Sequence, residues 1–319
     1  MDRADVCVLI PTYDEAETIG EVVDGYRAEG FSDILVIDGN STDGTRDIAR
    51  QCGARVETQT GTGKGQAIRE AMQYIDAPYV LMADGDGTNP PSDAAAMLEP
   101  LNRGYEHVVG NRFADMRSGA MTRLNKLGNR IVNRAFAYIH GENFVDILSG
   151  YRAFTRESFE RLNLTADGFG IETEMSIECA KRNVPTAVVP VTYHPRPDGS
   201  DTNLRPFRDG SVIFLELYRR AKTNNPLFYF GSIGTLSTLT GVVMAFYVAF
   251  EWFVPPRTSH EVIALGAAAG ILFGVQLLIF GVLADMILTF HREQLRRIEE
   301  LDDGESDASP AKRTQKQRR

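Results

Sequence analysis

Short apolar runs alternate with helically patterned stretches along the first 220 or so residues. The apolar runs at 7–11, 33–38 and 79–84 predict strands, and the spacing at 14–28, 43–53 and 65–75 predicts helices. This alternation is typical of an α/β domain with a mostly parallel sheet. A polar cluster follows each apolar run. Since ligands bind beyond the carboxyl ends of strands in such sheets, we expect the polar clusters to meet in one crevice.

Two uncharged stretches near the C-terminus break this pattern. Residues 228–250 and the run between Glu261 and Asp285 each contain 23 uncharged residues. A helix needs about 20 residues to cross a hydrocarbon core, so both stretches predict transmembrane helices, at about 228–250 and 262–288. The alternative is a pair of buried helices in a globular domain.

Basic residues flank the two predicted spans on one side only. Arg219, Arg220 and Lys222 precede the first span, and Arg292, Arg296 and Arg297 follow the second, whereas the connecting loop carries only Arg257. The positive-inside rule then predicts that both termini are cytoplasmic.

The predicted spans divide the chain into three parts. Residues 1–222 form a cytosolic catalytic domain, 223–292 a two-helix membrane anchor, and 293–319 a polar, disordered cytosolic tail. The first residues have no basic head and no long apolar stretch, so we expect no signal peptide.

Composition removes several classes of function. Lys plus Arg number 34 against 43 Asp plus Glu, a net charge of −9, which argues against a nucleic-acid partner. Three scattered cysteines are too few for a disulfide framework or a CxxC metal site, and they fit a cytoplasmic compartment. The sequence leaves a homo-oligomer open.

The polar clusters contain candidate ligands for a metal and a phosphate. Asp84 and Asp86 follow an apolar run, and at a strand end both carboxylates can face Mg²⁺ or Mn²⁺; a loop of solvated acids is the alternative. Lys64 lies in GTGKG, which lacks the Walker A and GxGxxG patterns but can offer a phosphate a point charge. Asp38 follows another apolar run, where it serves an Asx-rich turn or accepts hydrogen bonds from a base or ribose.

Seven motifs occur in an order that carries a family resemblance. They are PTYDE, IDGNSTDGT, GTGKG, DGDGTNPP, VVGNRF, DILSGYRAF and RPDGS. Over about residues 6–215 the chain resembles family 2 glycosyltransferases of the GT-A fold, specifically polyprenyl or dolichyl phosphate hexose synthases. With its two C-terminal spans it looks closest to haloarchaeal members that glucosylate dolichyl phosphate to start N-glycan assembly for surface-layer glycoproteins.

The resemblance implies a fold and a reaction. The fold is a GT-A domain, a Rossmann-like mostly parallel sheet flanked by helices, followed by two transmembrane helices. The reaction is inverting, metal-dependent transfer of a hexose, most simply glucose from UDP-glucose, to dolichyl phosphate at the cytoplasmic membrane face. A mannose or N-acetylhexosamine donor is the alternative, and a non-catalytic membrane scaffold with this fold is the alternative from another class.

The resemblance also assigns roles to single residues. Donor-binding positions are Pro11, Tyr13, Glu15, Asp38, Lys64, Asp84 and Arg196, while Asp84, Asp86 and Thr88 form the metal motif. Arg112, Ser149 and Arg152 match positions around the acceptor phosphate, and the catalytic set is Asp86, Arg112 and Arg152. Thr88 stands where mannose-transferring relatives often have Gln, which favours glucose and leaves the third metal ligand open. Asn203 replaces the usual lysine, and Arg205 is a candidate substitute for its charge.

One basic segment has two interpretations. Residues 112–134 hold six basic residues and one acid, and Leu124, Leu127, Ile131 and Ala135 share one helical face. This pattern fits an interfacial helix on anionic lipid, near where the acceptor enters, or an ordinary amphipathic helix that covers the sheet. Residues 211–222 form a second such segment. Glu172 and Glu174 lie near a helix start, where an acid either stabilises the helix or touches the donor sugar.

Overall fold

The structure is a computed structural model that describes residues 1–168, 170–197, 215, 218, 221–222, 225–253 and 260–306. The chain divides into two compact units, Met1–Leu217 and Tyr218–Arg319. Arg205, most of the segment 211–222, Arg257 and the tail beyond 306 lie outside the described residues.

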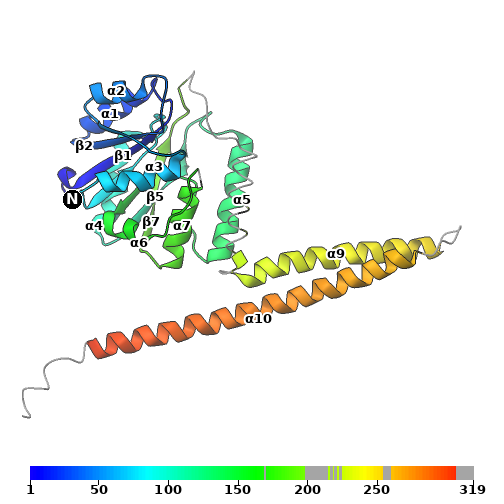
Figure 1. Cartoon of the computed structure of the whole chain (residues 1–319). Helices are drawn as coiled ribbons and strands as arrows, with labels where there is room; N and C mark the ends of the chain where they lie inside the picture. The colour runs from blue at the N-terminus through cyan, green and yellow to red at the C-terminus, as the bar shows by residue number, and fades with distance from the viewer. Residues whose placement is uncertain are drawn as a thin grey trace, which may run out of the picture. The chain divides into compact units, whose positions relative to one another are not determined.

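In the first unit, the described strands form one sheet of seven in the order β3-β2-β1-β4-β6-β5-β7 (Figure 1). The strands are β1 (Val6–Thr12), β2 (Asp33–Asp38), β3 (Arg55–Thr58), β4 (Tyr79–Met82), β5 (His107–Met116), β6 (Arg152–Thr155) and β7 (Thr186–Tyr193). Only β6 runs antiparallel to its neighbours β4 and β5; the other described pairs are parallel. The predicted α/β class with a mostly parallel sheet is confirmed.

Helices connect and cover these strands. They are α1 (Ile19–Ala28), α2 (Thr45–Gln51), α3 (Lys64–Ala71), α4 (Ala94–Asn102), α5 (Arg123–His140), α6 (Arg156–Arg161) and α7 (Ile171–Lys181). The helix predicted at 14–28 begins five residues late, at Ile19, because Asp14 has a left-handed backbone with φ 53°. The Glu15 N–H donates instead to the Thr45 hydroxyl at 2.9 Å, which ties this loop to the start of α2.

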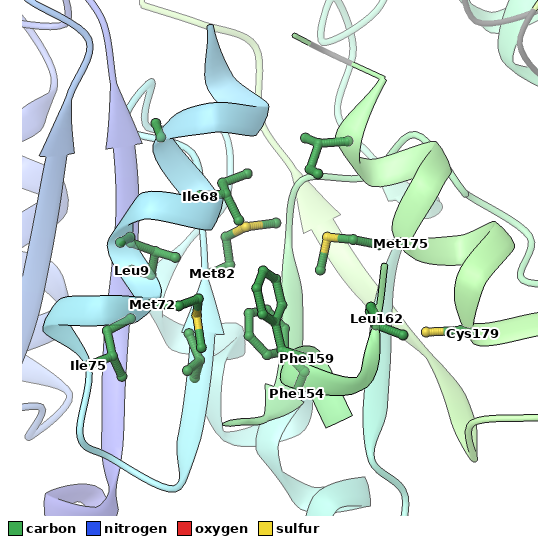
Figure 2. Close-up of a cluster of buried hydrophobic side chains, with 14 of the residues drawn as sticks. Leu9, Ile68, Met72, Ile75, Met82, Phe154, Phe159, Leu162, Met175 and Cys179 are labelled. Atoms are coloured by element: carbon green, nitrogen blue, oxygen red, sulfur yellow. The ribbon is translucent and has the colours of Figure 1, made fainter. Parts of the chain in front are cut away.

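Alternate residues of β1 pack into two cores on opposite faces of the sheet. Leu9 joins Ile68 of α3 and Met175 of α7 on one face (Figure 2), while Val8 joins Val23 of α1 on the other. All five side chains are fully or almost fully buried, and burying each one stabilises the fold by about 1.5 to 3 kcal/mol. The sheet is therefore held rigidly from both sides, and its strand ends are fixed.

The second unit consists mainly of two long helices, α9 (Pro226–Phe253) and α10 (Glu261–Ser306). By length and composition, Pro226–Phe253 and Glu261–His291 can each cross a membrane. Glycines bring the two helices together, since a Cβ on Gly234 would lie 2.6 Å from the Gly274 carbonyl oxygen. Most large apolar side chains of the pair face outward, which does not fit two helices buried in a globular core.

The predicted tail is wrong at its start. Residues 293–306 continue α10 instead of forming disordered chain. Their sequence, EQLRRIEELDDGES, is rich in Glu, Gln, Arg and Leu, which have high helix propensity.

Candidate active site

The polar clusters that follow β1 and β2 meet, as predicted. The Gly39 N–H donates to the Thr12 carbonyl at 2.8 Å, and the Asp14 N–H donates to the Ser41 hydroxyl at 2.9 Å. The loop after β4 joins them, because the Thr18 hydroxyl donates to the Gly85 carbonyl at 2.7 Å. Three strand ends thus form one polar surface, where ligands bind in α/β folds.

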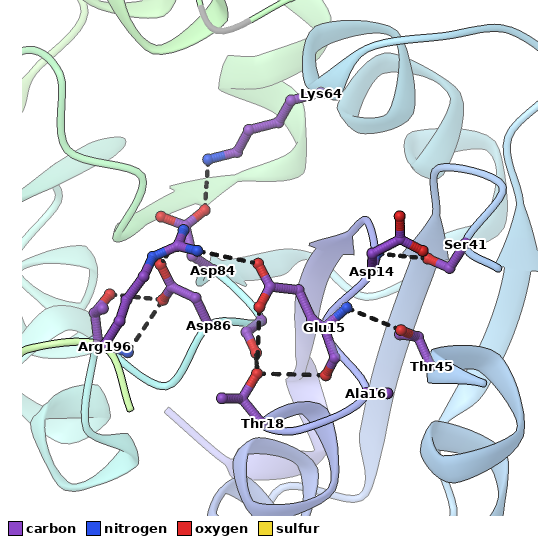
Figure 3. A network of polar contacts seen from close by, with 12 residues as sticks. Asp14, Glu15, Ala16, Thr18, Ser41, Thr45, Lys64, Asp84, Asp86 and Arg196 are labelled. Atoms are coloured by element: carbon purple, nitrogen blue, oxygen red, sulfur yellow. Dashed lines mark hydrogen bonds and ion pairs between the residues drawn. The ribbon is translucent and has the colours of Figure 1, made fainter. Parts of the chain in front are cut away.

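Lys64 lies at the start of α3 and bridges two carboxylates. Its Nζ is 2.5 Å from Asp84 Oδ1 and 2.7 Å from Glu172 Oε1 (Figure 3 shows the bond to Asp84). Burial lowers the pKa of a lysine, but the charges of Asp84 and Glu172 outweigh it and raise the pKa of Lys64. Burial raises the pKa of Asp84, and Lys64 outweighs it, so that pKa is lowered. Both groups are charged at neutral pH.

Arg196 forms the matching contact on the other carboxylate. Its Nη2 lies 2.8 Å from Asp86 Oδ2, and its Nη1 lies 3.6 Å from Glu15 Oε1 (Figure 3). Burial raises the pKa of Glu15 to about 7 against the opposing charge of Arg196, with Asp86 adding to the rise. Each cation is therefore held by two carboxylates, and Asp84 and Asp86 each accept one cation.

Asp86 is oriented by its own loop. Its Oδ1 accepts hydrogen bonds from the Thr88 N–H at 3.0 Å and the Thr88 hydroxyl at 2.7 Å. Thr88 is buried, so in this arrangement its hydroxyl supports Asp86. Thr88, the third position of the predicted metal motif, therefore orients the Asp86 carboxylate.

The two carboxylates offer a donor set that fits a hard divalent cation. Oxygen ligands from one or two carboxylates, completed by substrate phosphates, suit Mg²⁺ or Mn²⁺. Gly150 leaves the space that Asp84 needs, since a Cβ there would lie 2.5 Å from Asp84 Oδ2. Across the part of the chain that the structure describes, no three His, Cys, Asp or Glu side chains converge as a complete protein-only site. Asp84 and Asp86 therefore fit a cation shared with a substrate.

The polar surface at the end of β2 is built around Asp38, which is fully buried. Its Oδ2 accepts from the Ser41 N–H at 2.9 Å and lies 3.5 Å from Arg46 Nε. Its Oδ1 is buried without a hydrogen-bond partner among the described residues, which is costly unless a ligand donates to it. Pro11, also predicted to bind the donor, is buried in β1, whereas the predicted donor-binding residue Tyr13 is 48% exposed.

Sequence reasoning missed Gln59 beside Asp38. The Gln59 N–H donates to the Asp38 carbonyl at 3.0 Å, and the buried Gln59 Oε1 has no partner within the described ranges. It is the first residue after β3. Asp38 was singled out because it follows an apolar run. Gln59 follows β3 in the same way, but β3 is too short and too polar to be recognised as a strand from the sequence.

Arg112, predicted near the acceptor phosphate, is clamped by Asp146, the first residue of the DILSGYRAF motif, which was not among the predicted site residues. Its Nε and Nη2 donate to Asp146 Oδ2 and Oδ1 at 2.7 Å and 2.8 Å, and Asp146 is fully buried. The guanidinium carbon also lies 5.3 Å from the Tyr193 ring centroid. Burial lowers the pKa of Arg112, but Asp146 outweighs it and raises the pKa, so the charge is fixed.

Arg152 is a correction to the predicted acceptor site. Its side chain is fully buried, and its guanidinium donates to the carbonyls of Ile147, Ser149 and Glu172 and to the Ser176 hydroxyl, all at 2.8 to 2.9 Å. A phosphate cannot reach a group enclosed in this way, so the structure contradicts direct contact. Arg152 instead ties the loop before β6 to the start of α7.

Two neighbours of Arg152 are also enclosed. Ser149 is fully buried, and its hydroxyl has no partner in the described structure. Arg152 Nη1 lies 3.0 Å from His107 Nε2, and burial together with Arg152 lowers the pKa of His107 well below its usual value. His107 is therefore a neutral core residue.

Comparison with known proteins agrees with this geometry. Residues 7–162 match the model of glycosyl transferase family 2. Glycosyltransferase AglJ of Haloferax volcanii is 69% identical over 298 residues, which cover 93% of this chain and 98% of that protein. A dolichyl-phosphate hexose transferase of the same organism is 34% identical over 213 residues, covering 66% and 90% of the two chains.

A solved structure supports the fold. Glucosyl-3-phosphoglycerate synthase of Mycobacterium tuberculosis, solved with Mn²⁺, UDP-glucose and phosphoglyceric acid, superposes with a TM-score of 0.57 at 24% identity. The match covers 68% of this chain and 79% of that one. With the GT-A architecture, the two carboxylates at the end of β4 and these relatives in place, the chain belongs to glycosyl transferase family 2 and is a glycosyltransferase.

Proposed function

We propose that this glycosyltransferase transfers glucose from UDP-glucose to dolichyl phosphate, and so begins a lipid-linked glycan for protein N-glycosylation. The observation that carries the proposal is the set of two carboxylates and two cations after β4, in a chain with two candidate spans. The dolichyl-phosphate hexose transferase relative supports the acceptor. Solved GT-A proteins that bind UDP-glucose, together with Thr88 in the metal motif, support the donor.

On the donor side, Asp84 and Asp86 would hold a divalent cation. When bound, the cation neutralises the diphosphate of the donor. Lys64 and Arg196 lie beside these carboxylates and can turn to the phosphate oxygens as negative charge grows on the leaving group. Asp38, with its unpartnered Oδ1, and the exposed Tyr13 ring bind the nucleoside.

On the acceptor side, a phosphate is already ionised at neutral pH, so its oxygen needs no general base. Arg112, held by Asp146, orients it. The phosphate oxygen forms a bond to the anomeric carbon, while the bond from that carbon to the diphosphate breaks and its electron pair stays with the nucleoside diphosphate. A single displacement inverts the anomeric carbon and gives a β-linked product from an α-linked donor.

The membrane arrangement follows the basic flanks. Residues 1–222 and both termini lie on the cytoplasmic side, and 223–292 anchor the protein. Nucleotide sugars and the phosphate of the acceptor then meet on the same side of the membrane.

The test is transfer of radiolabelled sugar to a polyprenyl phosphate by membranes that carry the protein. UDP-glucose, GDP-mannose and UDP-N-acetylglucosamine are offered with Mg²⁺ or Mn²⁺ and, in parallel, with chelator. We expect cation-dependent labelling from UDP-glucose that Asp86→Ala removes. Labelling from another donor would correct the sugar, and no labelling from any donor would favour a non-catalytic scaffold.

A further inference from the structure

Helix α5 has two separate apolar faces, and only one of them packs on the protein. Val132, Phe136 and Ile139 are buried against the sheet domain. Leu124, Leu127 and Ile131 are 51% to 56% exposed. An ordinary amphipathic helix has one apolar face that covers the core, so that interpretation leaves the second row without a role.

The exposed row is continuous and is bordered by positive charge. At about 100° per residue, Leu124, Leu127 and Ile131 fall within about 60° of each other, roughly a third of a turn from the buried row. Basic residues follow on the side away from the buried row. They are Arg123, Lys126, Arg130 and Arg134, and Arg123–His140 contains no acidic residue.

We infer that this outer face of α5, defined by Leu124, Leu127 and Ile131 with its basic border, lies on the surface of an anionic lipid bilayer. Apolar side chains can enter the boundary between headgroups and acyl chains while arginines contact lipid phosphates. The positive charge of this border favours an anionic bilayer as the partner. The whole chain has a net charge of −9, yet these basic residues gather beside the exposed leucines. The candidate spans of the same chain keep a bilayer close by.

Contacts of α5 link this face to the candidate acceptor side. The Ile147 N–H donates to Asn133 Oδ1 of α5 at 3.0 Å, next to Asp146, which clamps Arg112. The helix begins 11 residues after Arg112 and ends six residues before Asp146. A docked α5 would therefore set the height of Arg112 above the lipid phosphates. This consequence rests on the proposed function, whereas the docking itself does not.

The test uses the full chain with Cys52→Ser, because Cys7 and Cys179 are buried. A bimane label is placed by Leu127→Cys, or by Glu21→Cys as the matched control on α1. Glu21 is exposed, and α1 packs on the opposite face of the sheet from α5. The proteins are reconstituted in vesicles of phosphatidylcholine and phosphatidylglycerol that carry a doxyl-labelled lipid.

We expect the doxyl lipid to quench the label at Leu127 and leave the label at Glu21 bright. Exchanging phosphatidylglycerol for phosphatidylcholine, or combining Arg123→Gln, Arg130→Gln and Arg134→Gln, should reduce the quenching. Quenching of Leu127 by aqueous iodide alone would overturn the proposal. So would spin labels at position 127 that show dipolar coupling between two copies, since a second copy would then cover the face.

A functional readout separates this inference from the proposed function. With Leu124→Gln and Leu127→Gln together, transfer to a long polyprenyl phosphate in vesicles should fall about tenfold or more, because the apolar contact with lipid is lost. Transfer to a short acceptor in detergent and binding of UDP should not change. Equal loss with both acceptors would contradict the docking, whereas lipid quenching without activity from any donor would contradict only the proposed function.

Discussion

The proposed donor side and the proposed acceptor side of the candidate site hold their positive charges in different ways. On the donor side, Lys64 and Arg196 contact Asp84 and Asp86, the same carboxylates that fit a divalent cation. On the acceptor side, Arg112 is clamped through two hydrogen bonds by a buried carboxylate that has no metal role. Arg152, behind it, is enclosed by carbonyl groups.

The proposed reaction accounts for this difference. A leaving diphosphate gains charge during the reaction, so its cations must be able to change partner. The acceptor phosphate keeps its charge until it attacks, so its arginine needs a fixed direction more than mobility. Exchangeable pairs therefore suit the donor side and permanent pairs the acceptor side.

The largest expected effect is on the donor carboxylates. Asp86→Ala removes one of the two candidate cation ligands and the partner of Arg196, so transfer should fall on the order of 10² to 10³. The measurement is initial rate at saturating donor and acceptor. Asp47→Ala, an exposed carboxylate on α2, is the control and should keep full activity. Full activity of Asp86→Ala with bound Mn²⁺ would remove Asp86 from the site.

Substitution by lysine should have different effects at Arg152 and at Arg112. Arg152→Lys loses the planar fork that bonds three carbonyls in the core, so the unfolding free energy should fall by about 3 kcal/mol. Apparent KM values for donor and acceptor should change little or shift together.

Arg112→Lys keeps the charge near the surface but loses the two-bond clamp of Asp146. It should raise the KM for the acceptor by about tenfold and leave the KM for the donor unchanged. Thermal unfolding and steady-state kinetics of both variants decide the comparison. A selective acceptor defect in Arg152→Lys would restore its predicted contact with the phosphate.

Arg112 and Arg152 show which parts of the structure could be predicted from the sequence and which could not. Strands β1, β2 and β4, helices α2 and α3 and the convergence of polar strand ends were predictable, because hydrophobic period and strand polarity are local properties. The motif around Ser149 and Arg152 marked the right loop, but burial of Arg152 depends on carbonyls from residues up to 20 positions away. The Asp146 clamp on Arg112 spans 34 positions, and no spacing rule reports such a pair.

Replacing Lys64 tests whether the cations of the donor side can change partner, and the expected effect is smaller. Its Nζ contacts the Asp84 oxygen that a divalent cation would use, so the lysine and the cation compete when no diphosphate is present. Lys64→Met should tighten Mn²⁺ binding in the absence of nucleotide and weaken UDP binding, each by about tenfold, which is about 1.4 kcal/mol. Electron paramagnetic resonance of free Mn²⁺ with and without UDP measures both, and Lys181→Met, on the far end of α7, is the control. If UDP changes Mn²⁺ binding equally in Lys64→Met and in the wild type, Lys64 does not exchange partners. It would then be a permanently paired cation, as Arg112 is.

Glu15 gives the smallest effect and a pH dependence. Burial raises the pKa of Glu15 to about 7 in the folded protein, from an ordinary value of 4.5. The folded state therefore holds this proton more tightly than the unfolded state, and the stability it contributes is complete below pH 4.5 and is lost as the pH rises through about 7. Glu15→Gln cannot lose that proton, so its unfolding free energy relative to the wild type should rise over this window. The full pKa shift corresponds to about 3.4 kcal/mol, and solvent screening of this partly buried carboxyl group reduces the expected rise to about 1 to 2 kcal/mol. Thermal unfolding of both proteins, with chelator present, measures the difference. The pH runs from about 5 to about 8, a range that brackets the folded pKa. A difference that stays flat with pH would mean that Arg196 keeps Glu15 ionised throughout, so that the Glu15–Arg196 pair belongs with the permanent pairs of the acceptor side.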